Sequence, residues 1–253
     1  MVLQAQEGRL VTSPVRVLVA TAVPAERDAV ARGFPEPGRE LHLPGVVLHR
    51  LHGPSGTFDL LAAGVGPALA AASASAALTA ARYEQAPYDL VVSAGIAGGF
   101  LPGAPVASLV VADRITAADL GAETADGFLP VTELGFGRVT HVPPPSLVRV
   151  AADATGAGVG TILTVSTVTG TASRAADLRA RHPRALAEAM EGFGVAEAAG
   201  AHDVAVAEIR AVSNAVGPRD RDAWRIGAAL TALTTAFGKL APVLESWNRH
   251  DDQ

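Results

Sequence analysis

The sequence predicts an α/β fold in which three layers, helices, sheet and helices, are built around a mixed central sheet. Short apolar runs typical of buried strands alternate along the chain with segments of helical pattern, which is the arrangement of α/β proteins. Hydrophobic residues make up 49% of the chain and charged residues 18%, as in compact globular proteins. We expect one domain over residues 15–253, after a mobile leader over residues 1–14.

The first half of the chain begins with the run VRVLVATA at 15–22, a buried strand, and Pro24 then opens a helix because proline is tolerated in a first helical turn. Further elements predicted here are strands at 46–51, 58–63 and 88–94 and an alanine-rich helix at 68–82. The stretches GVGP at 64–67 and GIAGGF at 95–100 each follow a strand. We expect both to be glycine-rich turns whose backbone amides can approach a ligand.

The second half begins with a loop-rich region at 101–145 and then alternates between helices and strands. The predicted elements are strands at 108–113, 160–166, 185–190 and 204–207 and helices at 146–154, 172–181 and 192–201. A final long helix carries one apolar face, formed by Ile226, Leu230, Leu233, Phe237, Leu240, Leu244 and Trp247. Pro242 is expected to kink this helix or to end it early.

Composition argues against several classes of function. The formal net charge is −5, and the basic run RARHPR at 179–184 is too short to indicate nucleic-acid binding. The chain has no cysteine, which excludes disulfides and thiol nucleophiles, and its histidines show no metal-ligand spacing. We therefore expect no metal and no cofactor. The start of the chain lacks a basic and then apolar signal, and no uninterrupted apolar run reaches about 18 residues, so a soluble cytoplasmic protein is expected, without membrane association.

The stretch IRAVSNAVGPRDRDAW at 209–224 carries the densest set of polar groups. The run VAVA at 204–207 is strand-like, and Gly217 with Pro218 breaks the chain before the last helix. Arg210, Ser213 and Asn214 are therefore expected at the carboxyl end of a strand, the end that faces the ligand crevice in α/β sheets. The alternative is that these side chains are solvated in a loop. Two carboxylates, Glu26 and Glu191, are also predicted at strand ends.

Six motifs together resemble the nucleoside phosphorylase and nucleosidase superfamily, and the resemblance extends from Val15 to about Leu244. They are VRVLVATAVPAERDAV, GVGPALAA, VVSAGIAGGF, TVSTVTG, EAMEGFGVAEAA and IRAVSNAVGPRDRDAW. The resemblance implies an enzyme that cleaves the N-glycosidic bond of a small purine nucleoside without a cofactor. It also implies a homo-oligomer, a dimer or larger, because in relatives a neighbouring subunit commonly closes the sugar pocket.

The resemblance also implies roles for individual residues. Glu191 matches the glutamate that accepts hydrogen bonds from the ribose hydroxyls, and Met190 matches a residue packed against the sugar. Glu26 matches the acid that holds and deprotonates the attacking water. Arg210 and Ser213 match residues that flank the water and base sites.

Other positions depart from the pattern of relatives. Asn214 stands where adenine-specific relatives carry Asp, and Val168 stands where they place an aromatic residue that stacks on the base. Ile96 replaces a serine beside the nucleophile. Gly98, in the same glycine-rich stretch, is expected to let the backbone approach the substrate.

Two of these residues indicate the chemistry. The place of the phosphate-binding arginine loop of phosphorylases reads TAVPAERD, and the Glu26 carboxylate would repel phosphate but suits water. An Asn214 amide can donate to N7 or O6 of a 6-oxopurine, which favours hypoxanthine or guanine over adenine. Hydrolysis of a 6-oxopurine nucleoside is therefore the leading interpretation. The alternatives are a nucleosidase for methylthioadenosine and adenosylhomocysteine, a purine nucleoside phosphorylase, and a purine-binding sensor without catalysis.

Overall fold

The computed structural model describes residues 14–247. The predicted leader at 1–14 lies outside the described residues, except for Pro14. The strands are β1 (Val15–Thr21), β2 (Arg39–Leu43), β3 (Val46–His52), β4 (Gly56–Ala62), β5 (Leu90–Gly99), β6 (Leu109–Ala117), β7 (Gly121–Thr124), β8 (Gly127–Pro130), β9 (Thr140–His141), β10 (Gly158–Thr164), β11 (Ala185–Ala189) and β12 (Ala205–Ala215). The helices are α1 (Pro24–Ala31), α2 (Pro67–Tyr83), α3 (Pro145–Thr155), α4 (Ala172–Arg181), α5 (Gly192–Ala201) and α6 (Ile226–Ser246).

One large mixed sheet forms the middle layer, in the order β11-β10-β6-β12-β5-β1-β4-β3-β2, with β9 added beside β6. The pairs β1–β4, β1–β5, β5–β12, β6–β10 and β10–β11 are parallel, whereas β12–β6 and β3–β4 are antiparallel. Strand β11 also pairs with β5, so β5, β12, β6, β10 and β11 form a closed ring of neighbouring strands. The predicted mixed sheet is confirmed.

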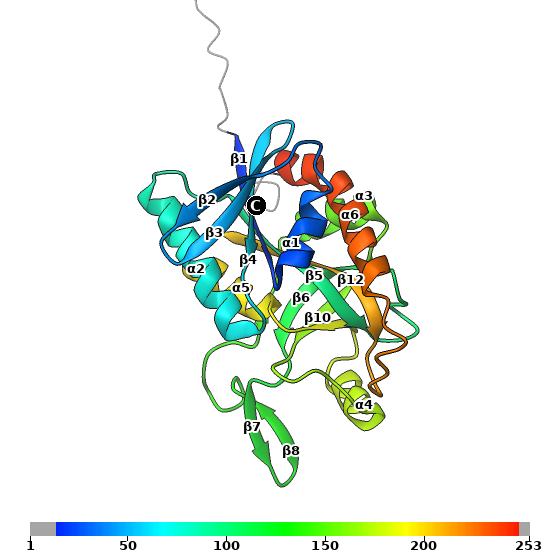
Figure 1. Ribbon diagram of the computed structural model, residues 1–253. Helices are drawn as coiled ribbons and strands as arrows, with labels where there is room; N and C mark the ends of the chain where they lie inside the picture. The colour runs from blue at the N-terminus through cyan, green and yellow to red at the C-terminus, as the bar shows by residue number, and fades with distance from the viewer. Residues whose placement is uncertain (1–13, 248–253) are drawn as a thin grey trace, which may run out of the picture.

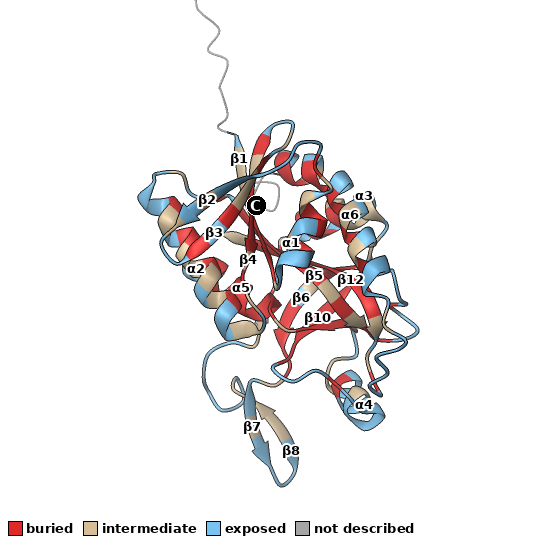
Figure 2. Ribbon diagram, in the orientation of Figure 1, coloured by how far each residue is buried: buried red, intermediate tan, exposed pale blue. Residues whose placement is uncertain are grey.

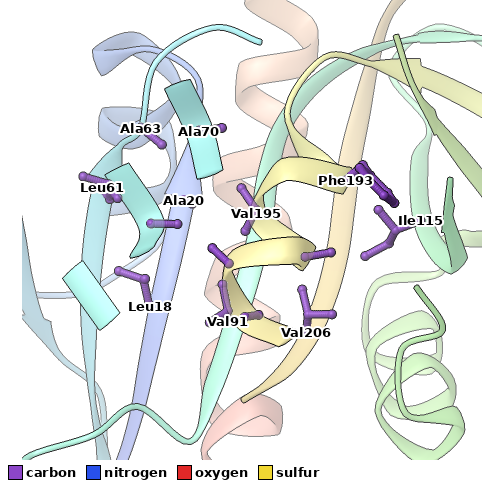
Figure 3. Packing of buried hydrophobic residues seen from close by; sticks show 14 of the residues in the cluster. Leu18, Ala20, Leu61, Ala63, Ala70, Val91, Ile115, Phe193, Val195 and Val206 are labelled. Carbon is purple, nitrogen blue, oxygen red and sulfur yellow. The ribbon is translucent and has the colours of Figure 1, made fainter. Parts of the chain in front are cut away.

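Helices cover both faces of this sheet (Figures 1 and 2). Helices α2 and α5 lie on one face, and their buried residues share a hydrophobic cluster with the sheet, including Ala70 and Val195 (Figure 3). Helices α1, α3 and α6 lie on the other face, and a second cluster contains Val30, Leu147 and Phe237. The two clusters confirm the three-layer arrangement. The β7–β8 hairpin projects away from this body (Figure 1).

Helix α6 runs through Pro242 to Ser246, so the proline does not end it early. Its buried face matches the prediction from Leu233 onward, whereas Ile226 is exposed and Leu230 is half-buried. In the part of the chain that the structure describes, α6 is the one helix long and apolar enough to cross a membrane by length and composition. Leu233 and Leu240 are buried against the sheet, so a core helix of a folded domain accounts for this composition.

Candidate active site

Strands β5 and β12 lie side by side at the centre of the sheet and carry most of the predicted site. Their parallel register places Arg210 opposite Gly95 and Asn214 opposite Gly98. Both strands run further than the sequence predicted. Arg210 lies within β12 and not at its end, and GIAGG is part of β5 instead of a turn. The reason is that each strand is held by sheet partners along this length.

The side chain of Arg210 is 1% exposed and organises the middle of the site. Its Nε donates to Oε1 of Glu208 over 2.9 Å, and its Nη2 donates to Oγ of Ser93 over 3.1 Å. Its Nη1 lies 3.2 Å from Oε2 of Glu191. A guanidinium held by hydrogen bonds at two of its nitrogens and by an ion pair at the third has a fixed orientation. Arg210 therefore presents its charge to the substrate side from a rigid position.

Glu26 lies in the first turn of α1 and is 4% exposed. Its Oε2 accepts from the backbone amides of Ala22 (2.9 Å) and Val23 (3.2 Å), and its Oε1 accepts from the amide of Ile96 (2.8 Å). Burial raises the pKa of Glu26 above its ordinary value, while the Arg210 guanidinium and the Ile96 amide act in the opposite direction. The structure thus brings the Glu26 carboxylate to the backbone of Ile96.

Gly95 explains how Glu26 and Arg210 come together. A Cβ atom on Gly95 would lie 2.6 Å from Oε1 of Glu26 and 2.7 Å from Nη1 of Arg210, closer than side-chain carbons pack. The absence of a side chain at this position therefore lets both charged groups approach the β5 backbone from α1 and β12. Glycine is used here for close approach rather than for a turn.

Glu191 lies between β11 and α5 and is 5% exposed. Its Oε1 accepts from the backbone amide of Gly66 (3.2 Å), and its Oε2 faces Arg210. The amide of Gly66 belongs to the GVGP stretch, so this predicted glycine-rich turn does reach the site. Met190, next to Glu191, is half-buried.

Glu208 is a member of the site that the sequence analysis did not single out. It is fully buried, its Oε1 accepts from Arg210, and its Oε2 has no hydrogen-bond partner among the described residues. A Cβ atom on Gly192 would lie 2.1 Å from Oε2, so this glycine makes room for the carboxylate. Burial raises the pKa of Glu208 to about 7, although the Arg210 guanidinium lowers it. Three buried carboxyl groups, those of Glu26, Glu191 and Glu208, thus share one guanidinium.

We expect the Glu208→Gln variant to lose part of the pH dependence of stability. Because the folded state raises the pKa of Glu208 from 4.5 to about 7, the group stabilises the fold most below pH 4.5 and loses that contribution as the pH rises through 7. The shift corresponds to a loss of about 3 kcal/mol. Urea unfolding at pH 5 and pH 8 should therefore show a smaller drop for the variant than for the wild type. Equal drops in both proteins would show that Glu208 does not titrate in this range.

Ser213 and Asn214 form a polar pair near the end of β12. A register shift between Val212 and Asn214 leaves Ser213 at a bulge, a feature that redirects side chains. The Ser213 hydroxyl donates to Oδ1 of Asn214 over 2.7 Å, and Nδ2 of Asn214 donates to the carbonyl of Ala215 over 3.0 Å. Gly98 lies beside this amide, since a Cβ there would be 3.4 Å from Nδ2. The Asn214 amide is therefore oriented, and one of its N–H groups remains free to donate.

A small cavity lies beside Asn214. It is lined by Val168, Thr169, Asn214, Ala215, Gly217, Pro218, Arg219, Asp220, Ala223 and Trp224. Larger cavities lie elsewhere among the described residues, two of them around Arg114 and Arg184 and one beside Ala76 and Tyr83, and no predicted site residue lines any of these three. We assign the site to the smaller cavity and to the buried carboxylates around Arg210, because the residues singled out in the sequence lie at these two places.

The chain resembles known proteins in sequence and in fold. The family described as the phosphorylase superfamily matches residues 46–243. A futalosine hydrolase from Streptomyces coelicolor is 75% identical over 94% of this chain and 100% of its own length, and one from Acidothermus cellulolyticus is 47% identical over 89% and 90%. A futalosine hydrolase mutant of Helicobacter pylori has a similar fold, with a TM-score of 0.74 at 18% identity over 91% of this chain and 98% of that chain.

A methylthioadenosine/adenosylhomocysteine nucleosidase from Colwellia psychrerythraea in complex with adenine also has a TM-score of 0.74, at 20% identity over 90% of this chain and 96% of that chain. At these identities the solved structures establish the fold alone. They confirm the predicted nucleoside phosphorylase-like architecture, and the sequence relatives give the assignment within it. The chain belongs to the phosphorylase superfamily and, within that superfamily, to the futalosine hydrolases.

Proposed function

We propose that this protein hydrolyses the N-glycosidic bond of futalosine and releases hypoxanthine and dehypoxanthine futalosine, a step of menaquinone biosynthesis. The name of the relatives supports the substrate. The observation that favours water over phosphate as the nucleophile is the set of hydrogen bonds that the Glu26 carboxylate accepts. Backbone amides at a helix N-terminus are a ready anion site, but here the amides of Ala22, Val23 and Ile96 already bind the Glu26 carboxylate.

The proposed reaction uses the buried charges as follows. The oxygen of a water molecule bonds to C1′ of the ribose and transfers a proton to Oε1 of Glu26. The bond between C1′ and the purine nitrogen breaks, and its electron pair leaves with the base, which takes up a proton. Positive charge develops on the sugar and negative charge on the base, so the carboxylates of Glu26 and Glu191 face the cationic part. Arg210 keeps these two carboxylates in place.

The proposed base contact comes from Asn214. Because its Oδ1 accepts from Ser213, its free N–H points a donor at the base. A donor suits O6 or N7 of hypoxanthine and stabilises the negative charge of the departing base. The 6-amino group of adenine is itself a donor and would face the Asn214 N–H, which leaves both groups unpaired. Sites with such unpaired buried groups discriminate strongly against the wrong base. Cleavage of methylthioadenosine or adenosylhomocysteine is therefore the second candidate, and the purine nucleoside phosphorylase activity is third.

We further propose a cytoplasmic homo-oligomer that binds no nucleic acid, no membrane and no cofactor. The resemblance to relatives in which a neighbouring subunit closes the sugar pocket supports the oligomer, and the formal net charge of −5 supports the absence of nucleic acid. Size-exclusion chromatography with light scattering would test the oligomeric state.

We predict that hypoxanthine release from futalosine proceeds at the same rate with and without phosphate. The occupied amides leave no place for a dianion, whereas one water fits beside Glu26. The measurement is hypoxanthine release in phosphate-free buffer and in buffer with phosphate, with analysis of the sugar product. A rate that depends on phosphate, together with a sugar 1-phosphate, would replace hydrolysis by phosphorolysis. If adenine is released from methylthioadenosine faster than hypoxanthine is released from futalosine, the second candidate is favoured.

A further inference from the structure

The base end of the site has valine, Val168, at the position where adenine-specific relatives place an aromatic residue. Val168 is 41% exposed, and its side chain offers no π face. The same cavity, however, is lined by an aromatic side chain from elsewhere in the chain, that of Trp224. Trp224 lies in the segment 216–225 between β12 and α6, and Val168 lies between β10 and α4. The two residues therefore line the cavity from different parts of the chain.

The segment 216–225 starts with a hydrogen bond from the Val216 amide to the Gly99 carbonyl (2.8 Å), and two further hydrogen bonds hold it over the cavity. The amide of Arg225 donates to the carbonyl of Ser213 over 2.8 Å, which ties the end of the segment to β12 beside Asn214. The amide of Arg219 donates to the carbonyl of Gly170 over 3.3 Å, which ties its middle to the loop that carries Val168. The segment thus bridges the two sides of the cavity, and Trp224 lies between the tie points.

Two guanidinium groups lie against the Trp224 indole. The Cζ atoms of Arg219 and Arg221 are 5.3 and 5.9 Å from the ring centroid, within the range of cation–π contact. Arg219 lines the cavity together with Asn214. These cations lie at the end of the site where a departing purine would carry negative charge, opposite the end that holds the carboxylates of Glu26 and Glu191. The Asp220 carboxylate lines the same cavity, so the Arg219 guanidinium is not the only charged group at this end.

We propose that Trp224 is a substrate-binding residue of the base subsite, where its indole stacks on a 6-oxopurine base in place of an aromatic residue at Val168. The chemical class follows from the neighbours: Asn214 supplies a donor to the base edge, and Arg219 supplies positive charge. The identity of the base rests on the proposed function. Stacking on an aromatic ring accepts any base, so Trp224 supplies affinity while Asn214 selects among purines.

The chain offers a matched control because it contains two tryptophans. Trp247 follows α6, is 7% exposed, and donates from Nε1 to Oγ of Ser146 over 2.8 Å. It lies among residues of the α1, α3 and α6 layer and does not line the cavity. Each single replacement by phenylalanine leaves one tryptophan as a fluorescent reporter, Trp224 in the Trp247→Phe variant and Trp247 in the Trp224→Phe variant.

The experiment is a titration of both variants and the wild type with hypoxanthine, followed by tryptophan fluorescence and by equilibrium dialysis. We expect saturable quenching in the wild type and in Trp247→Phe, and none in Trp224→Phe, although that variant still binds hypoxanthine through its phenyl ring. Trp224→Leu should bind about tenfold more weakly, a change of about 1.4 kcal/mol, and Trp224→Phe should restore most of the affinity. If Trp247→Phe does not fold, the comparison of the wild type with Trp224→Phe gives the same answer.

Three results would overturn the proposal. They are hypoxanthine binding by dialysis without a change in Trp224 fluorescence, equal affinities of Trp224→Leu and the wild type, and no saturable binding of hypoxanthine at all. Hypoxanthine release from futalosine by the wild type is measured separately. If the wild type does not cleave futalosine but hypoxanthine still quenches its fluorescence, the proposed function is contradicted and the proposed base subsite is not. If it cleaves futalosine but hypoxanthine causes no quenching, only the proposed base subsite is contradicted.

Discussion

Replacing Glu191 by glutamine should lower kcat/KM for futalosine by at least about a hundredfold while the protein remains folded. The reason is that the neutral amide no longer places a negative charge beside the sugar as it becomes cationic. A carboxylate can accept from two ribose hydroxyls at once, and a glutamine side chain offers one acceptor oxygen and one donor nitrogen. The variant also removes the charge that faces Nη1 of Arg210 at 3.2 Å. Initial rates of hypoxanthine release, with circular dichroism as a check on folding, would measure the effect.

Glu197→Gln is the matched control for that experiment. Glu197 lies on α5, the helix that follows Glu191, and its side chain is 44% exposed and bonded to His141. The control removes the same charge from the helix that follows Glu191 without touching the site, so its activity should stay near that of the wild type. A folded Glu191→Gln protein with activity near that of Glu197→Gln would show that Glu191 does not hold the sugar.

The fold could be predicted from the sequence because its buried strands are short apolar runs and its helices begin and end at clear signals. Helices α4 and α5 have the bounds that were predicted, 172–181 and 192–201. The strand β2 was missed since its sequence, RELHL, is polar and the strand is largely exposed at the edge of the sheet. An edge strand buries little apolar surface, and the alternation of polar and apolar residues over five positions is a weak signal.

The glycine-rich stretch at 95–99 was interpreted as a turn for a related reason. Sequence patterns associate such a stretch with turns, but here β5 continues through it, and Gly95 and Gly98 are close to side chains from other elements. What determines these glycines is the approach of Glu26, Arg210 and Asn214, contacts between residues far apart in the chain. Local sequence reasoning has no access to such contacts.

Glu208 is the member of the site that a pattern in the sequence could have revealed. Successive side chains of a strand point to opposite faces, so Glu208 and Arg210 lie on the same face of β12. A Glu and an Arg two residues apart within an apolar run indicate a buried ion pair, because neither group is stable alone in such a strand. The hydrogen bonds from the Gly66 amide to Glu191 and from Arg210 to Ser93, in contrast, depend on the three-dimensional arrangement.

Glu26→Gln should bind hypoxanthine with near wild-type affinity and turn over futalosine about 10²–10⁴-fold more slowly, the usual contribution of a general base. The amide cannot take the proton of the attacking water. It also meets backbone donors on both sides, Ala22 and Val23 on one and Ile96 on the other, so its NH₂ group faces an N–H in either orientation. One unsatisfied pair of this kind destabilises the fold by about 1–3 kcal/mol.

The measurement has to separate these two effects of the Glu26→Gln replacement. Single-turnover rates at a temperature well below the unfolding transition report chemistry alone, and dialysis with hypoxanthine reports binding. Asp28→Asn is the control on the same helix, since Asp28 is half-exposed and pairs with Arg27. Because burial raises the pKa of Glu26, wild-type kcat should fall as the pH drops through a value above 4.5, whereas the residual rate of Glu26→Gln should lack that limb. An unchanged single-turnover rate, or the same acid limb in the variant, would assign the water's proton to another group.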